Sequence, residues 1–326
     1  MPRDTGAAAG QRLCFVVQTG AGYELTMATS PTGTSGRRKV PAAASLDCAT
    51  AFQTMALDCV AAIKAHHSSA CASDVEAVHQ IRVAITRLRG AVKFFASIVV
   101  DAEWPRLKRE IAWLNGPLGA ARDYDVLMEY ARRKRYHAWA RRMIGKQIDE
   151  RQARNHRRLV RCLRSVRTQR FVAALAGWIK QGPWVERYRR RKDAEALGPY
   201  CARRLNRWHE RLVSKGRHLE TLGSSRRHQV RIKAKRFRYM LEALTETVSL
   251  RGRGELHHLH RPAKRLQRAL GDMRDLERFA DLADGSPQAD IGKRGKKHPP
   301  GYSHQRERLL DAAIAAHRDL QQAGAC

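Results

Sequence analysis

Histidine and arginine recur at matching positions in two copies of one motif. The segment HQIRVAITRLR at 79–89 returns as HQVRIKAKRFR at 228–238, an offset of 149 residues, and five of the eleven positions are identical. Guanidinium groups form paired hydrogen bonds with phosphate oxygens, lysine acts as a mobile point charge, and histidine donates from either ring nitrogen. The motif therefore favours the binding of an anionic ligand.

Helical periodicity arranges each copy into an apolar seam and a polar stripe. The stripes consist of His79, Arg82, Thr86, Arg89 and Lys93 in the first copy, and of His228, Arg231, Lys235 and Arg238 in the second. At about 100° per residue, the first stripe lies roughly 120° from its seam, so it borders the core. Cations about one turn apart would follow a linear chain of phosphates, and such binding should weaken steeply with salt.

A run of arginine and lysine on a helix is more often a solvated face than a binding site. The runs at 132–135 and 187–192 are interpreted in that way. The stripes differ from these runs because the same residue types stay in register in both copies, which a solvated face would not require. We therefore expect the stripes to bind a ligand.

A second motif follows each copy at nearly the same offset. LGAARD at 118–123 and LGDMRD at 270–275 lie 152 residues apart, which indicates an internal duplication. Arg122 and Arg274 are further candidates for contacts with phosphate. Asp123 and Asp275 are expected to cap the helix that follows each motif. The alternative is that each aspartate holds a stripe arginine or histidine by a salt bridge.

The net charge is +32, from 63 lysines and arginines against 31 aspartates and glutamates in 326 residues. Such a charge attracts nucleic acid, inorganic polyphosphate and anionic membranes. Hydrophobic residues make up 43% of the chain, which excludes a disordered basic tail. The chain has no apolar run of the ~20 residues needed to span a bilayer, no signal-peptide layout, and seven widely spaced cysteines. We expect a cytoplasmic protein with reduced thiols and no membrane partner.

Enzymatic motifs are absent from the sequence. It contains no GxxxxGK[ST], no GxGxxG after a strand and no HExxH, and no carboxylate pair stands in an acid/base setting. Cations surround His79 and His228 in the motifs, and cations repel a metal ion. The HHLH segment at 257–260 is interpreted as a polar stretch of helix. We therefore expect neither an enzyme nor a metal or cofactor site.

The remaining pattern is helical from residue 46 onward. The predicted division is a linker or disordered segment at 1–45, a first helical repeat at 46–183, and a second at 184–326 with a basic loop at 284–303. Ser73-Asp74 is expected to cap the helix that carries the first motif. Asn115-Gly116-Pro117 is expected to end a helix over 104–114, and a break is expected between helices over 256–270 and 276–283. The prediction is an all-α chain of two similar bundles.

Four segments, in this order, resemble the CHAD family, whose name stands for conserved histidine α-helical domain. They are AVHQIRVAITRLRGAVKFF, LNGPLGAARDYDVL, HQVRIKAKRFRYMLEAL and LQRALGDMRDLERFADL, and the resemblance spans 45–323. It implies two tandem four-helix-bundle-like repeats with pseudo-twofold symmetry and a basic central groove or channel. It also implies binding of inorganic polyphosphate without catalysis, often at polyphosphate granules.

The resemblance extends to individual residues. Those that match the family's basic motif are His79, Arg82, Arg87, Arg89, His228, Arg231, Lys235, Arg236, Arg238 and Tyr239. Thr86 departs from the pattern, which commonly has a basic residue where the second copy has Lys235, so we expect weaker anion binding in the first copy. Many CHAD chains follow a CYTH triphosphate-processing domain. The segment GYEL at 22–25 resembles the end of one, but no ExExK motif precedes it, so triphosphatase activity is not expected.

The alternative function is general binding of nucleic acid or other polyanions. Proteins that bind single strands interleave cations with aromatic residues that stack on bases. Tyr239 is the only aromatic residue in or next to either basic stripe. The charge alone predicts non-specific binding of DNA or RNA at low salt. No sequence pattern indicates an oligomeric state or a preferred length of the anion.

Overall fold

The structure, a computed structural model, describes residues 46–145, 147–191, 195–247, 253–284 and 298–324. All regular secondary structure within these ranges is helical, which confirms the predicted all-α class. The predicted linker at 1–45, including the CYTH-like segment, lies outside the described residues, as does most of the basic loop predicted at 284–303. None of the described helices combines the length and apolar character needed to cross a membrane.

The helices divide at the segment around residue 190. Before it lie α1 (Cys48–Ala65), α2 (His67–Cys71), α3 (Val75–Phe94), α4 (Ala96–Val99), α5 (Trp104–Arg132), α6 (Lys134–Met143), α7 (Gln147–Leu163), α8 (Val166–Gln181) and α9 (Pro183–Arg189). After it lie α10 (Leu197–Lys215), α11 (Ser224–Thr247), α12 (Arg253–Asp284) and α13 (Tyr302–Ala323). The first motif lies on α3 and the second on α11.

Side-chain caps fix where several helices begin. Asp74 accepts a hydrogen bond from the amide of Ala77 at 2.6 Å, which confirms the predicted cap of α3. Asp47 caps α1 in the same way through the amide of Thr50 at 2.7 Å. Such caps satisfy amides that have no partner within the first helical turn. The cap of α3 therefore fixes the residue at which the motif helix starts.

The predicted helix ends at Asn115-Gly116-Pro117 and near residue 270 are wrong. The helix α5 continues through Pro117 to Arg132, and α12 runs without a break from Arg253 to Asp284. In α5, buried Leu107, Ile111 and Leu114 before the proline and buried Leu118 after it all belong to one core. Burial of this continuous face outweighs the hydrogen bond that Pro117 cannot form. Both aspartate motifs therefore lie inside long helices.

Residues from both sides of residue 190 form one main hydrophobic core. Phe52 packs edge-to-face against Trp184, with ring centroids 5.3 Å apart. Phe94 at the end of α3 packs against Trp208 of α10 at 5.4 Å, and Phe95 stacks on Tyr200 at 5.5 Å. A smaller cluster surrounds Phe279, where α5, α6 and α12 meet. The motif helices are thus fixed to a shared core.

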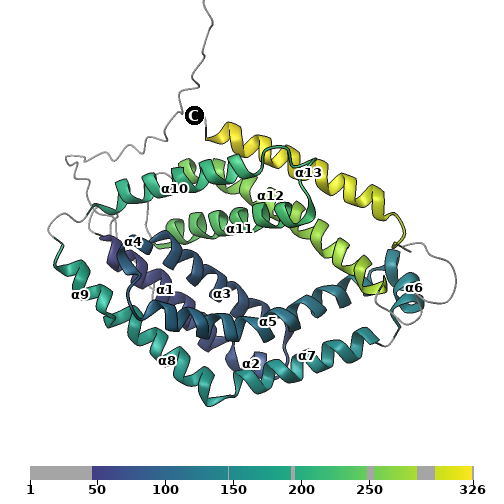
Figure 1. The fold of residues 1–326 in the computed structure, drawn as a ribbon, viewed down its shortest axis with the longest axis horizontal. Coiled ribbons are helices and arrows are strands. Elements are labelled where there is room, and N and C mark those ends of the chain that lie inside the picture. The colour runs from purple at the N-terminus through teal and green to yellow at the C-terminus, as the bar shows by residue number, and fades with distance from the viewer. Residues whose placement is uncertain (1–45, 146, 192–194, 248–252, 285–297, 325–326) are drawn as a thin grey trace, which may run out of the picture.

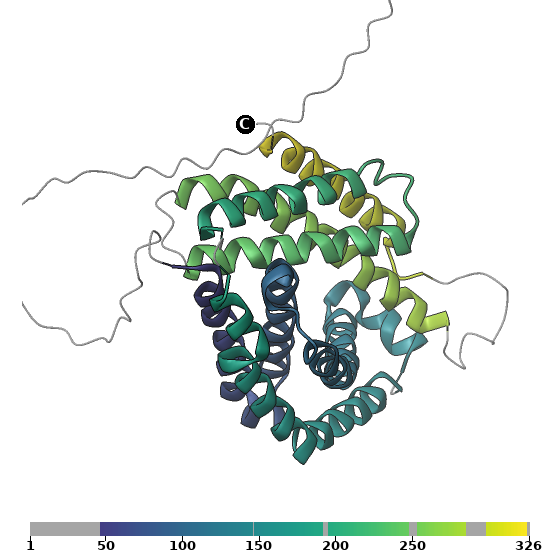
Figure 2. The ribbon, with the colours of Figure 1, turned by 60° about the vertical axis from the view of Figure 1, so that its left-hand side comes forward.

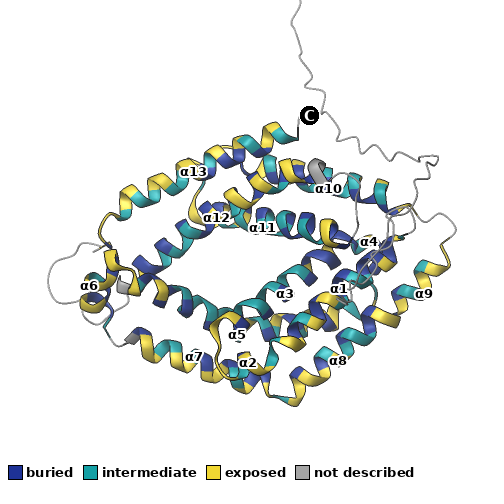
Figure 3. Ribbon diagram, turned by 180° about the vertical axis from the view of Figure 1, so that it is seen from behind, coloured by how far each residue is buried: buried dark blue, intermediate teal, exposed yellow. Residues whose placement is uncertain are grey.

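The motif helices lie at the centre of the molecule. In Figure 1, α1 to α9 occupy the lower part and α10 to α13 the upper part, with α3 and α11 facing each other between them. Figure 2 shows α10 and α11 side by side above the first group of helices. Exposed residues gather on outer helices such as α7, α8 and α13, whereas α3 and α11 are mostly buried or half-buried (Figure 3). The polar stripes therefore border the core, as the periodicity predicts.

Candidate anion-binding site

Cations from both motif pairs meet where α3, α5, α11 and α12 pack together. The pairs α3–α11, α3–α5, α11–α12 and α5–α12 are all in contact. Charges on Arg122 of α5 and Lys235 of α11 both influence His79 of α3. We call this group the central cluster. It consists of His79, Arg82, Arg122, His228, Arg231, Lys235 and Arg274.

Each motif arginine of the central cluster lies beside a glycine of the second motif. Nη1 of Arg82 donates to the carbonyl oxygen of Gly119 at 3.1 Å. A Cβ atom placed on Gly119 would lie 3.4 Å from Nη1 of Arg82, and one on Gly271 would lie 3.4 Å from Nε of Arg231. The similar offsets of the two motifs thus have a physical cause, because each glycine leaves room for a guanidinium group.

The motif aspartates act through charge rather than as helix caps. Oδ1 of Asp123 lies 3.6 Å from Arg82, and Oδ2 lies 2.9 Å from Arg278 of α12. Burial raises the pKa of Asp275, whereas the charges of Arg231 and Arg278 lower it. The capping prediction is therefore wrong, and the alternative salt bridge is confirmed for Asp123.

Burial lowers the pKa of the lysine and of both histidines in the central cluster. The pKa of Lys235 falls to about 7 because the side chain is buried, and Arg82, Arg231 and Arg238 lower it further. Burial also lowers the pKa of His79 and of His228, with Arg122 and Arg274 the largest charge contributions respectively. An anion among these groups would favour their protonated forms.

Two nitrogen atoms of the central cluster are buried without a hydrogen-bond partner among the described residues. They are Nε of Arg231 and Nδ1 of His228. A buried donor without a partner costs about 1–3 kcal/mol, so an acceptor that reaches it is stabilising. The cluster can therefore offer donors, as well as positive charge, to a phosphate group.

A different arrangement surrounds Glu242 of α11. Its carboxylate lies 2.7 Å from Arg238, 2.9 Å from His260 and 3.3 Å from Arg87. The predicted contact residue Tyr239 is 7% exposed. The ring centroid of Tyr239 lies 4.3 Å from the guanidinium carbon of Arg238. We call Arg87, Arg238, Glu242, Glu246 and His260 the Glu242 cluster. Its arginines already have acidic partners.

The other predicted cations lie in a third group. Arg236 and Lys233 of α11 influence Lys93, as do Arg204 and Arg211 of α10, and Arg89 influences Arg236. We call Arg89, Lys93, Arg204, Arg211, Lys233 and Arg236 the α10 cluster. The structure thus separates the thirteen predicted contact residues into the central cluster, the α10 cluster and, with Tyr239 beside it, the Glu242 cluster.

Sequence reasoning missed Glu242 and the three cations Arg204, Arg211 and Lys233. The duplication carried a signal for the first of these, because Glu242 takes the place of Lys93 when the copies are superposed at the offset of 149 residues. No such signal was available for α10, which carries neither motif. Only the packing of α10 against α11 brings its cations to the stripe.

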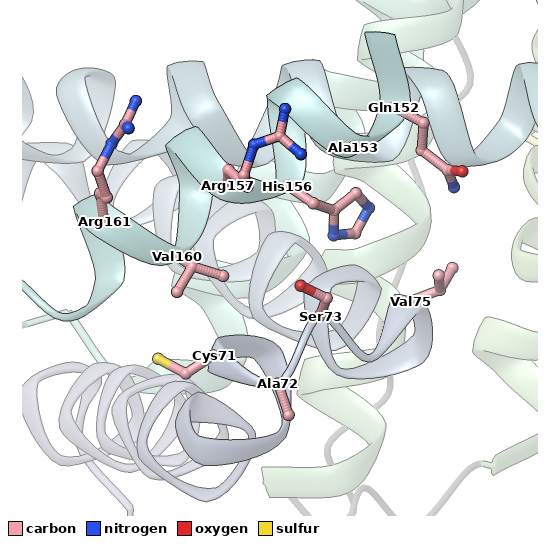
Figure 4. Close-up of a pocket in the computed structure, with 10 residues that line it drawn as sticks. All are labelled: Cys71, Ala72, Ser73, Val75, Gln152, Ala153, His156, Arg157, Val160 and Arg161. Carbon is pink, nitrogen blue, oxygen red and sulfur yellow. The ribbon is translucent and has the colours of Figure 1, made fainter. Parts of the chain in front are cut away.

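A sizeable pocket lies apart from these three clusters, and no candidate metal site is found among the described residues. Across the described ranges, no three His, Cys, Asp or Glu side chains gather in a group that could hold a metal ion. A pocket of about 690 Å³ lies between α7 and the link from α2 to α3 (Figure 4). In Figure 4 the imidazole of His156 points toward Ser73 across this pocket. Its Nε2 lies 2.7 Å from buried Asp125, so this pair joins α5 to α7.

Comparison with known proteins identifies similar chains. The family model described as the CHAD domain matches residues 54–284. The crystal structure of the CHAD domain from the plant Ricinus communis is similar over 88% of this chain and 97% of its own, with a TM-score of 0.66 and 23% identity. PptA from Streptomyces chartreusis is similar over 85% of this chain and 97% of its own, with a TM-score of 0.55 and 19% identity. Comparison with curated proteins gives no significant match.

Proposed function

The chain belongs to the CHAD family, and from this premise we propose that it binds inorganic polyphosphate through the central cluster without catalysing a reaction. The main support is the convergence of cations from four helices on one half-buried place, where Nε of Arg231 has no hydrogen-bond partner among the residues that the structure describes. Among the described residues, Asp275 and Asp123 are the carboxylates with the largest influence on Arg231, and Asp272 also interacts with it. Like charges held together in this way oppose folding, and a bound polyanion offsets that repulsion.

The residue types of the central cluster suit a chain of phosphates. Arginine can donate two parallel hydrogen bonds to one phosphate, while lysine supplies a point charge whose position adjusts. His79 and His228 add donors, and a nearby anion would favour their protonated forms. A phosphate chain presents the same acceptors at every unit, so contacts from several helices can act on one ligand.

The environment of Tyr239 favours polyphosphate over single-stranded nucleic acid. Stacking on bases needs an aromatic face that the bases can reach. The ring of Tyr239 is buried and has Arg87, Lys235 and Arg238 within 5.6 Å of its centroid. This residue therefore fixes cations rather than offering a stacking platform. A protein that binds polyphosphate in the cell would concentrate at polyphosphate granules, which we include in the proposal.

A competition titration tests the ligand. Labelled long-chain polyphosphate bound to the full chain is displaced by unlabelled polyphosphate, duplex DNA or single-stranded RNA, at matched phosphate concentration and near-physiological salt. We expect only polyphosphate to compete well, and its chain length to stay unchanged during incubation with the protein. Equal competition by nucleic acid would reject the proposal in favour of general polyanion binding.

A pair of double variants tests the site. Arg82→Ala with Arg231→Ala removes two guanidinium groups of the central cluster. Arg189→Ala with Arg190→Ala removes the same charge from exposed side chains that pair with Glu186. We expect the first variant to lose at least about tenfold in affinity for polyphosphate, because hydrogen bonds to charged groups contribute ~1.5–3 kcal/mol each. Equal losses in both variants would indicate a diffuse charge effect.

A further inference from the structure

The duplicated stripes end in opposite ways. On α3 the stripe ends at Lys93, whereas the equivalent position on α11 is Glu242. Arg87 of the first copy reaches Glu242 and Glu246. Its counterpart in the second copy, Arg236, instead lies near the cations Arg89 and Lys93. The second copy thus has Glu242 where the first has Lys93. This difference distinguishes the Glu242 cluster, in which carboxylates pair with the arginines, from the α10 cluster, which consists of cations alone.

No carboxylate balances the α10 cluster in the described part of the chain. None of its six side chains forms an ion pair there, and the largest charge contributions to the pKa of Lys93 and of Lys233 come from other cations. Burial lowers the pKa of Lys93 and of Lys233, and these neighbouring cations lower both further. Arg204 donates from Nε to the carbonyl oxygen of Phe94 at 2.9 Å and from Nη2 to that of Lys93 at 2.8 Å. These hydrogen bonds fix the end of α3 against α10. They thereby hold the cations of the two helices close to one another.

The α3 stripe connects the α10 cluster to the central cluster. Arg82 and Lys93 lie on the same stripe, and Arg89 lies between them. Their separation of eleven residues corresponds to roughly 16 Å along the helix axis. A ligand that starts at Arg82 must be long enough to cover this distance before it meets Lys93. The equivalent path along α11 ends at the Glu242 cluster, whose arginines already have carboxylate partners and are therefore less available to an anion.

We propose that the α10 cluster is a second phosphate-binding contact, which a long polyphosphate chain reaches from the central cluster along α3 and a short chain does not. The inference rests on the proposed function and adds to it a direction for the bound chain and a dependence of affinity on chain length. It also assigns binding roles to Arg204 and Arg211, which lie outside the repeated motif, and to Lys233, which lies within the motif segment but not on its stripe.

The test compares two lengths of the same ligand. The triple variant Lys93→Gln, Arg211→Gln and Lys233→Gln leaves Arg204 in place, because that side chain also caps the end of α3. The control is Lys64→Gln, Lys108→Gln and Arg109→Gln, which removes the same charge from exposed positions on α1 and α5. Affinities for long-chain polyphosphate and for tripolyphosphate are measured on both full-length variants by calorimetric titration.

We expect the triple variant to lose at least about tenfold more affinity for long-chain polyphosphate than the control does, with tripolyphosphate binding equal in both. A loss that is equal for the two ligands, or no greater than in the control, would overturn the inference and leave the proposed function standing. Failure of the unmodified chain to bind either ligand would instead reject the proposed function, and with it this extension.

Discussion

At the scale of single residues, the position of each carboxylate decides which cations remain free for a ligand. Asp123 lies beside Arg82 and Arg278, and Glu242 holds Arg87, Arg238 and His260. By contrast, the α10 cluster forms no ion pair within the described ranges, and Nε of Arg231 is buried there without a hydrogen-bond partner. Total charge therefore says less about binding than the distribution of a few acidic side chains.

Lys235 should make polyphosphate binding depend on pH. Its pKa of about 7 lies below the ordinary value of 10.5, so the folded chain without ligand releases this proton as the pH rises through 7. Binding above that pH requires the proton to be taken up again. We expect affinity to fall by up to about tenfold per pH unit above 7, and titrations between pH 6 and 9 at constant ionic strength would measure it.

The variant Lys235→Arg serves as the control for that dependence, because guanidinium keeps its proton across this range. Its affinity should change much less between pH 7 and 9. In the unmodified chain without ligand, the free energy of unfolding should instead rise with pH, whereas the affinity falls. The unfolded chain keeps the Lys235 proton up to about pH 10.5, so the contribution of this group to the free energy of unfolding rises between pH 7 and 10.5. An identical pH dependence of affinity in both proteins would contradict the role given to Lys235.

At the scale of helices, the sequence predicted element type better than element ends. The seam and stripe of α3 and the cap at Asp74 are local properties, and both are found in the structure. The continuation of α5 through Pro117 is not local, because it depends on the core that buries Leu114 and Leu118. Dependence on non-local packing also explains why the sequence did not indicate a role for Arg204 and Arg211. Their role follows from the packing of α10, for which the motifs give no pattern.

Gly216 at the end of α10 should tolerate no side chain. A Cβ atom there would lie 2.3 Å from Cδ2 of His317, which is buried and whose Nε2 lies 2.9 Å from the carbonyl oxygen of Val213. We expect Gly216→Ala to lower the free energy of unfolding by about 1–3 kcal/mol, since overpacking forces neighbouring groups apart. Chemical denaturation would measure the change.

The matched control for this substitution is Gly177→Ala in α8. A Cβ atom at Gly177 would have no neighbour within 4 Å. Alanine there should raise the free energy of unfolding by up to ~1 kcal/mol through its better helix propensity. If Gly216→Ala proved as stable as Gly177→Ala, the packing between α10 and α13 would be looser than the structure indicates.

At the scale of the whole molecule, the duplication does not produce two independent cores. The predicted boundary between 183 and 184 stays a prediction, but aromatic contacts cross it at several points. Phe94 and Phe95 of the first segment contact Tyr200 and Trp208 of the second, and the hydroxyl of Tyr200 donates to the carbonyl of Phe94 at 2.8 Å. The motif helices α3 and α11 also pack directly on each other. A site built at their junction therefore exists only when both halves are folded.

This shared core predicts that the chain unfolds in one cooperative step. Separating 46–183 from the rest would expose Phe94 and Phe95. The burial of each of these side chains contributes about 1.5–3 kcal/mol to stability, and the isolated segment would lose this contribution. Because whole domains are stable by only ~5–15 kcal/mol, we expect the isolated segment not to fold. Scanning calorimetry of the full chain should show a single transition whose van't Hoff and calorimetric enthalpies agree, and polyphosphate should shift that transition upward as one unit. Two resolved transitions, with only one of them moved by the ligand, would place the binding site within one half and contradict a site formed jointly by α3, α5, α11 and α12.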